Sequence, residues 1–361
     1  MINVTKAFLP PLAEYVGYLE GVWERGWLTN NGPLVQKLET DLTEYLDGAY
    51  VQFLSNGTIA LQIAIKALGL TGEIITTPFS YVATTTAILW ENCEPVFVDI
   101  EQKTFCIDAG KIEAAITPRT TGILATHVYG YPCDVIAIEE IARRHNLKVI
   151  YDGAHAFGVR LYGRQLLTYG DLSTCSFHAT KLFHTTEGGG IIVRDEELNK
   201  KISLYKSFGH VGDEYFTLGV NGKNSEFHAA MGLCNLPRVS GFIDARRKLA
   251  MLYKRELDGL SIQFPSPDES VMEYNYAYFP VLFSNENEMR FIKDLLFKNG
   301  INTRRYFFPS LNQLPYLTGA QCSVSEDISS RVLCLPFYQE LDAEEVVNIC
   351  SIIKGGLILQ N

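Results

Sequence analysis

The chain has 361 residues, a net charge of −10, and 47% hydrophobic and 20% charged residues. This length allows one large domain plus a smaller one, each with a sizeable core, and the composition is that of an ordinary globular protein. The acidic balance argues against a general nucleic-acid-binding protein, since phosphate backbones are held by clustered Lys and Arg, but backbone amides and helix ends can still bind a small anion.

The cysteines, the histidines and the N-terminus bear on compartment and metal binding. The 8 cysteines show no CxxC pair, and most lie in apolar runs such as RVLCLPF, so we expect buried thiols in a reducing compartment. The 7 histidines show no HExxH motif, which disfavours a metal hydrolase, and we expect no metal site. The start MINVTKAFLPPLAEY lacks a signal-peptide core, and no apolar run is long enough to span a bilayer. We therefore expect a cytoplasmic protein that does not cross a membrane.

From about residue 50 to 195, short β-rich runs alternate with helical ones. This alternation predicts an α/β fold with parallel strands joined by right-handed helical crossovers. In such sheets ligands collect outside the carboxyl ends of the strands. Strands are predicted at 73–80, 94–100, 121–130, 147–152, 173–178 and 189–195, and helices at 58–69 and 134–146, the second capped by Asp134.

Beyond about residue 240 the pattern changes. We interpret residues 241–361 as a smaller α+β domain, and residues 1–240 as an N-terminal segment with the large domain. No linker rich in Pro, Gly or Ser marks the boundary. Helices are predicted at 244–257, 286–300 and 343–355, and a strand at 276–283.

The stretch SNGT at residues 55–58 opens an amphipathic helix. Free backbone N–H groups there, with the Thr58 hydroxyl, can hold a phosphate. Taken alone, this stretch is better explained by an ordinary helix cap. Neither GxxxxGK[ST] nor GxGxxG occurs, so the common nucleotide-binding loops are absent.

Other chemically capable residues follow predicted strands. Asp152 ends the strand KVIYD and is followed closely by His155, and Tyr81 follows another strand, where its ring could stack on a planar ligand. Lys181 lies between two strands, with Ser, His, Thr and Gly as its near neighbours. Taken singly, Tyr81 could be a packing residue and Lys181 a solvated charge.

Together these residues fit one ligand, pyridoxal 5′-phosphate. The Lys181 amine, its pKa lowered by partial burial, can bind the aldehyde covalently. Asp152 can keep the pyridine nitrogen protonated, and Tyr81 can cover the ring. Gly57, Thr58 and Ser176 can hold the phosphate.

The chain also resembles a known family over nearly its whole length. The motifs are GWLTNNGPLVQKLE, SNGTIAL, TTPFSYVATTTAI, THVYGYPCD, YDGAHAFG, SFHATKLFHTTEGG and NGKNSEFHAAMGL. They are similar to those of the nucleotide-sugar aminotransferases of the DegT type, which are pyridoxal phosphate enzymes of fold type I. The resemblance implies a mostly parallel sheet in a large domain, a small C-terminal domain, and a homodimer with active sites at its interface.

The resemblance also assigns residues. Lys181 matches the lysine that carries the cofactor, Asp152 the partner of the pyridine nitrogen, and His155 a residue near the phenolic oxygen. Asn221 matches an asparagine that reaches the phosphate from the other subunit. The remaining matches are Ser176 as a phosphate ligand, Tyr81 as the stacking aromatic, and His178, Arg304, Arg305 and Tyr306 as substrate-facing residues. We expect at least one of the two arginines to bind substrate; the alternative is that both are a solvated surface pair.

The expected activity follows from the same resemblance. Family members that dehydrate sugars carry His in place of the lysine, so Lys181 implies transamination. The pattern SFHATK…TTEGG, with His178 and Glu187, is most similar to the subgroup that aminates 4-keto sugars. We expect amination of dTDP-4-dehydro-6-deoxy-D-glucose to dTDP-4-amino-4,6-dideoxy-D-glucose with L-glutamate as donor, in the synthesis of amino sugars for surface polysaccharide.

Several alternatives remain open. The substrate could be a 3-keto sugar, or a sugar carried on UDP or GDP. A non-catalytic paralogue or a regulator that binds pyridoxal phosphate is a different class, although the chain shows neither a helix-turn-helix appendage nor a basic face. A cysteine desulfurase of the same fold would need a cysteine on a mobile loop, and the cysteines here favour apolar runs.

Overall fold

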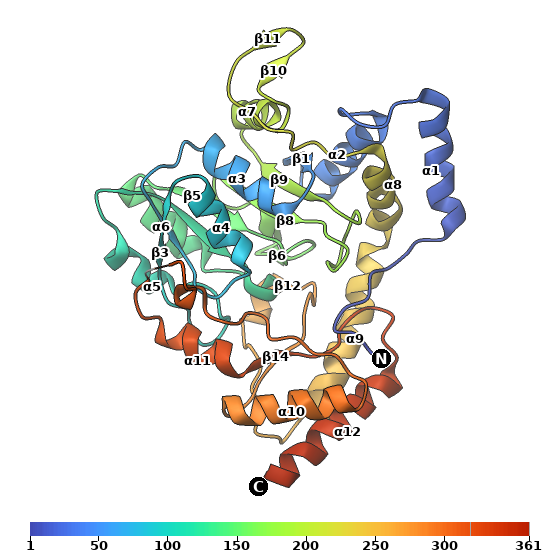
Figure 1. Cartoon of the computed structure of the whole chain (residues 1–361), viewed down its shortest axis with the longest axis vertical. Helices are drawn as coiled ribbons and strands as arrows, with labels where there is room; N and C mark the ends of the chain where they lie inside the picture. The colour runs from blue at the N-terminus through green and yellow to red at the C-terminus, as the bar shows by residue number, and fades with distance from the viewer. Residues whose placement is uncertain (318, 361) are drawn as a thin grey trace.

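The computed structural model describes residues 1–317 and 319–360. Its centre is a seven-stranded sheet with the strand order β1-β9-β8-β5-β4-β2-β3, covered by helices (Figure 1). In that order the strands are Tyr50–Leu54, Gly189–Val193, Leu172–Ser176, Lys148–Asp152, Thr120–Thr126, Glu73–Thr76 and Glu94–Phe97. The predicted α/β class is confirmed, and each of the six strands predicted between residues 73 and 195 is present.

The sheet is mostly parallel, with one exception. Strands β2, β3, β4, β5 and β8 pair in parallel, whereas β9 pairs antiparallel with both β8 and β1. The prediction of parallel strands was wrong for β9, because residues 177–188 between β8 and β9 form a loop without a crossover helix. Strand β1, which was not predicted, runs in the direction of β8. The carboxyl ends of β1, β8, β5, β4 and β2 therefore share one edge.

Alternating side chains along the strands separate two apolar layers. Ile74 and Leu124 belong to one buried cluster, while their neighbours Ile75 and Ala125 belong to another. The first cluster includes residues of α3 (Gly57–Ala67), α4 (Val82–Trp90) and α7 (Glu196–Lys206), and the second includes residues of α2 (Pro33–Tyr45), α5 (Ala109–Ile112), α6 (Val135–His145) and α8 (Glu226–Asn235).

The C-terminal part of the chain has its own buried cluster, which runs from Leu249 to Leu357. The helices of this part of the chain are α9 (Val239–Glu256), α10 (Glu286–Lys298), α11 (Ser323–Arg331) and α12 (Ala343–Gln360). Its strand β13 (Pro280–Leu282) pairs antiparallel with β14 (Val332–Cys334). The three helices predicted in this part are present. A domain boundary at residue 240 stays a prediction. Ile2 forms a parallel bridge with Ile301, so the start of the chain joins this part.

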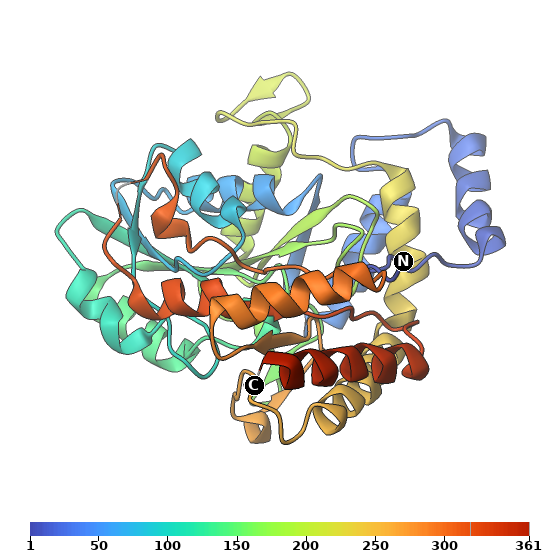
Figure 2. The same cartoon turned by 60° about the horizontal axis from the view of Figure 1, so that its bottom comes forward.

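Two segments stand away from the body in both views (Figures 1 and 2). One is α1 (Leu12–Arg25), and the other is a hairpin formed by β10 (His210–Val211) and β11 (Glu214–Tyr215). The second segment begins after α7 and returns to the body at Asn221, which forms a bridge with Ser207.

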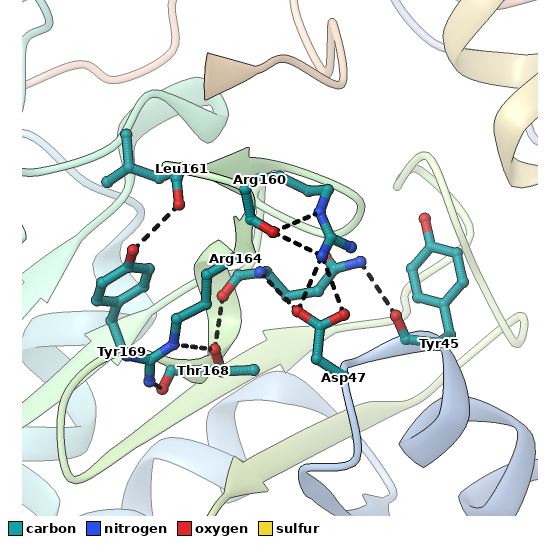
Figure 3. Close-up of polar contacts among 9 residues, drawn as sticks. Tyr45, Asp47, Arg160, Leu161, Arg164, Thr168 and Tyr169 are labelled. Atoms are coloured by element: carbon teal, nitrogen blue, oxygen red, sulfur yellow. Dashed lines mark hydrogen bonds and ion pairs between the residues drawn. The ribbon is translucent and has the colours of Figure 1, made fainter. Parts of the chain in front are cut away.

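A cluster of polar side chains around Asp47 and Arg160 contacts the segment that connects β5 to β8 (Figure 3). Arg160 of β6 (Arg160–Leu161) pairs with Asp47, which follows α2, at 3.0 Å. Arg164 of β7 (Arg164–Gln165) lies over the ring of Tyr169, with its guanidinium carbon 4.2 Å from the ring centroid. The short strand β12 (Met272–Glu273) completes this small sheet. These contacts hold the chain that connects Asp152 to Lys181.

All 8 cysteines are buried and free, as predicted for thiols in apolar runs. Within residues 1–317 and 319–360, no helix combines the length and the apolar character needed to cross a membrane.

Candidate active site

A cavity of about 300 Å³ lies at the carboxyl edge of the sheet. Its walls come from the N-terminus of α3, the ends of β4, β5 and β8, the loop between β8 and β9, and the segment from Tyr278 to Phe307 of the C-terminal part. This is the location expected for a ligand site in such a sheet. The predicted residues that line it are Gly57, Thr58, Tyr81, Asp152, His155, Ser176, His178, Lys181, Arg304 and Tyr306.

Lys181 lies in the loop that joins β8 to β9. Its backbone N–H donates to the carbonyl of His178 at 2.8 Å, and the loop is closed by the N–H of Ala179 donating to Thr186. The ammonium group donates to the hydroxyl of Tyr278 at 3.4 Å. Burial lowers the pKa of Lys181, which favours the neutral, nucleophilic amine. The lysine is therefore a half-buried amine in the cavity wall and not a solvated surface charge.

Asp152 is the last residue of β5 and is buried. One carboxylate oxygen accepts from the hydroxyl of Thr84 at 2.7 Å, and the other accepts from the N–H of Ala154 at 3.1 Å. Burial raises the pKa of Asp152, while these hydrogen bonds and the charge of Lys181 act in the opposite direction. The carboxylate is thus placed to bind a cationic group in a water-poor setting.

The ring of His155 is held in one orientation and one tautomer. Its Nδ1 accepts from the backbone N–H of Tyr129 at 3.2 Å, and the ring stacks on Phe307 with centroids 5.6 Å apart. Burial lowers the pKa of His155, so the ring is neutral. A neutral ring whose Nδ1 accepts must carry its proton on Nε2. His155 can therefore donate a hydrogen bond through Nε2.

The start of α3 forms an anion cradle. Asn56 caps the helix, its side chain accepting from the N–H of Ile59 at 2.9 Å. Gly57 lies against Ser176, and a Cβ at position 57 would be 3.1 Å from the Cβ of Ser176. The first N–H groups of a helix have no acceptor within it, and here they border the cavity beside the hydroxyls of Thr58 and Ser176. This arrangement suits a phosphate.

Three polar residues border the cavity on other sides. His178 faces Glu187 at 3.6 Å, and both residues border the cavity. Arg304 lies with its guanidinium carbon 4.4 Å from the centroid of the Tyr306 ring, and no carboxylate pairs with it among the described residues. An exposed, unpaired guanidinium at a cavity can bind a carboxylate or phosphate.

Two predicted residues do not line this cavity. Arg305 turns away, because its guanidinium pairs with Glu286 at 3.1 Å and donates to the carbonyl of Ser330 at 2.7 Å. Arg305 instead borders a second cavity together with Tyr81 and Arg304. That at least one of the two arginines binds a substrate stays a prediction. Asn221 is exposed at the base of the projecting hairpin. Its predicted role requires a second subunit, so its place in one chain leaves that prediction untested.

Sequence reasoning missed several residues that contact the predicted ones. Tyr278 contacts Lys181, Phe307 stacks on His155, and Thr84 bonds Asp152. Tyr278 and Phe307 come from the C-terminal part, and no local sequence pattern predicts that they pack against this edge of the sheet. Thr84 lies in TTPFSYVATTTA, a stretch that was noted only for Tyr81. The only hint in the sequence was that Thr84 lies four residues after Ser80, one helical turn along the chain.

A model of the DegT/DnrJ/EryC1/StrS aminotransferase family matches residues 13–354. The chain belongs to this family. Two relatives, from Shigella dysenteriae and Escherichia coli, are each named dTDP-4-amino-4,6-dideoxy-D-glucose transaminase. The first is 45% identical and the second 42% identical, and the alignments cover 98% and 99% of both chains respectively. The resemblance seen in the sequence is thereby confirmed.

Solved structures of the family agree. The structure of DesI with its TDP-sugar product has a TM-score of 0.93 and 29% identity, with 99% of this chain and 94% of that chain covered. The structure of ntda from Bacillus subtilis with bound cofactor PMP has a TM-score of 0.87 and 31% identity, covering 95% of this chain and 82% of that chain. The family's aminotransferases use pyridoxal phosphate, and the chain is such a sugar aminotransferase.

The residues around the cavity fit this cofactor. The amine of Lys181, the carboxylate of Asp152 and the anion cradle at Gly57 all border one cavity, and they correspond to an aldehyde, a ring nitrogen and a phosphate. The N–H of the His155 ring would supply a donor for the phenolic oxygen. When bound, the cofactor supplies the electron sink that a carbon–nitrogen exchange requires.

Proposed function

We propose that this chain transfers the amino group of L-glutamate to C4 of dTDP-4-dehydro-6-deoxy-D-glucose, which yields dTDP-4-amino-4,6-dideoxy-D-glucose. The observation that carries the proposal is the juxtaposition of Lys181 and Asp152 in one cavity, in a chain whose relatives of that name are 45% and 42% identical. We propose a place for this reaction in the cytoplasmic synthesis of amino sugars for surface polysaccharide.

The proposed roles follow from the environment of each side chain. Lys181, whose pKa burial lowers, binds the cofactor aldehyde and moves a proton at the substrate carbon. Asp152 holds the ring nitrogen protonated, and His155 donates to the phenolic oxygen through Nε2. Tyr81 covers the ring. The phosphate is held by Gly57, Thr58 and Ser176.

Substrate binding is proposed for the polar residues at the cavity rim. Arg304 binds an anionic group of glutamate or of the sugar nucleotide, because its planar fork bonds two oxygens at once. Tyr306 lies beside it, and His178 faces Glu187 across the rim. These groups suit a substrate that combines hydroxyls with negative charge.

We further propose a homodimer with shared active sites. The hairpin segment 208–220 carries large apolar side chains into solvent, and Asn221 follows it directly. Contiguous exposed apolar side chains mark interaction surfaces. The exposed residues are Phe208, Val211, Tyr215, Phe216, Leu218 and Val220. A partner that covers this hairpin would bring Asn221 close to a phosphate cradle.

The test is an assay of the purified protein with L-glutamate and a panel of keto-sugar nucleotides. The panel contains dTDP-linked 4-keto and 3-keto 6-deoxyhexoses and the UDP- and GDP-linked 4-keto sugars, and mass spectrometry and NMR identify the product. We expect the highest kcat/KM for dTDP-4-dehydro-6-deoxy-D-glucose and an amine at C4.

The other outcomes separate the alternatives. An amine at C3, or a higher kcat/KM for a UDP- or GDP-linked sugar, would contradict the proposed substrate but not the reaction. Tight binding of pyridoxal phosphate without turnover of any member of the panel would instead favour the non-catalytic paralogue or regulator.

A further inference from the structure

Behind Asp152 lies a row of three buried hydroxyl groups. Thr84 donates to the carboxylate at 2.7 Å, its oxygen lies 2.7 Å from that of Ser80, and Thr126 donates to Ser80 at 3.1 Å. The three residues are at most 2% exposed. None of them was singled out from the sequence, and the proposed function assigns them no role.

The row has one internally consistent direction. A hydroxyl has a single proton, and Thr84 places its proton on the Asp152 carboxylate. The contact between Ser80 and Thr84 must then be a donation from Ser80. Thr126 in turn donates to Ser80. All three protons therefore point toward the carboxylate, and hydrogen bonds aligned in this way strengthen one another in a low-dielectric interior.

The fold holds this row firmly. Thr126 is the last residue of β4, Ser80 lies in the loop after β2, and Thr84 is in the first turn of α4. Of these elements, β4 pairs directly with β5, which ends at Asp152, and β2 pairs with the other side of β4. With Ala154 donating to the other carboxylate oxygen, both oxygens of Asp152 accept from the protein. No described group accepts a proton from this carboxylate within the chain, so these hydrogen bonds favour its ionised form and oppose burial, which raises the pKa of Asp152.

We propose that Thr84 is a positioning residue, aligned by Ser80 and Thr126, that keeps Asp152 ionised and thereby keeps the shared proton on the ring nitrogen of the bound cofactor. This inference rests on the proposed function, in which Asp152 pairs with that nitrogen. Without the donation from Thr84, the proton would move toward the carboxylate, and the ring would withdraw electrons less strongly.

The test uses holoenzyme loaded with pyridoxal phosphate that is ¹⁵N-labelled in the ring, so that the ¹⁵N chemical shift reports protonation of the nitrogen without any substrate. Thr84→Val removes the hydroxyl and keeps the side-chain shape. We expect its ¹⁵N shift to move toward the unprotonated value and kcat to fall about tenfold or more, with KM for glutamate within about twofold. Thr84→Ser, which retains the hydroxyl, should restore both readouts.

The adjacent residue supplies a matched control. Thr85 lies on the same helix and is fully buried, but its hydroxyl has no hydrogen-bond partner among the described residues. Thr85→Val should therefore leave the ¹⁵N shift and kcat at their wild-type values, and melting temperatures identify any variant that does not fold. If Thr85→Val or Thr84→Ser loses as much as Thr84→Val, packing matters and not the hydroxyl, and the inference is overturned.

Asp152→Asn separates the inference from the function on which it rests. A shifted ¹⁵N signal in Asp152→Asn with an unchanged signal in Thr84→Val would overturn the role of Thr84 and leave that of Asp152 intact. An unchanged signal in Asp152→Asn would overturn both roles. Wild-type protein that binds no cofactor would overturn the proposed function itself, and this inference with it.

Discussion

Burial shifts the pKa values of Lys181 and Asp152 in opposite directions, and the charge of each residue opposes the shift of the other. Burial lowers the pKa of the lysine and raises the pKa of the aspartate, so burial alone favours both neutral forms. The result is an amine that loses its proton readily, in one cavity with a carboxylate whose ionised form is supported by hydrogen bonds from Thr84 and Ala154 against the effect of burial.

A pH prediction follows for Lys181. Its pKa lies below the ordinary value of 10.5, so the rate at which apoprotein binds pyridoxal phosphate covalently should rise with pH and level off below pH 10.5. In Asp152→Asn the midpoint should fall further, because the lost negative charge is one of those that raise the pKa of Lys181. Growth of visible absorbance after mixing gives the rate, and a midpoint at or above 10.5 would contradict the burial argument.

Substitutions of the two neighbouring arginines should have different effects. Arg304 borders the cavity and has no carboxylate partner within the part of the chain that the structure describes, whereas Arg305 pairs with Glu286 and donates to Ser330. Arg304→Lys should raise KM for glutamate or the sugar nucleotide about tenfold or more, equivalent to roughly 1.4 kcal/mol, and leave the cofactor spectrum unchanged. Arg305→Lys should lower the melting temperature without moving either KM. Steady-state kinetics decide, and normal KM values in Arg304→Lys would leave the anion-binding group unidentified.

At the scale of single residues, sequence reasoning identified the charged side chains of the site. Asp152 and Lys181 follow short apolar strands, where a charged side chain is unusual enough to be noticed. The hydroxyls of Thr84, Ser80 and Thr126 are uncharged and come from three separate elements. Their alignment depends on how the strands are ordered in the sheet, which the pattern of one chain does not contain.

At the scale of elements, the loop between β8 and β9 and the hairpin of β10 and β11 distinguish this fold from a plain alternation of strands and helices. The loop places Lys181 in the cavity and turns the chain so that β9 runs antiparallel. The direction of β9 was mispredicted because its apolar run GGIIV resembles that of a parallel core strand. The hairpin has only two residues in each strand, too few for any periodicity to predict it.

The hairpin supports a prediction about subunit pairing. If Asn221 reaches the partner's cofactor, Lys181→Ala and Asn221→Ala homodimers are both impaired, yet a heterodimer contains one site with both residues intact. Purified heterodimers carrying two different tags should recover roughly half of the wild-type activity, because one of two symmetric sites is complete. Re-paired Lys181→Ala subunits with the same two tags are the control. Verified heterodimers without recovery would count against a shared site.

At the scale of the whole molecule, the cavity lies where the sheet meets the C-terminal part of the chain. The sheet supplies Asp152, Lys181 and the anion cradle, and the C-terminal part supplies Tyr278, Arg304 and the ring of Phe307. Composition and periodicity predicted the class of each part, since helices and parallel strands carry local patterns. They could not predict how one part closes over the other, because those contacts join residues 97 or more positions apart.

The central claim is that Lys181 carries pyridoxal phosphate and exchanges an amino group with glutamate. Borohydride reduction of the holoenzyme, followed by peptide mapping by mass spectrometry, tests it most directly. We predict a cofactor adduct on Lys181 and its disappearance when glutamate is added before borohydride, because the aminated cofactor is no longer bound to the lysine. An adduct on another lysine, or one on Lys181 that glutamate does not diminish, would contradict the account.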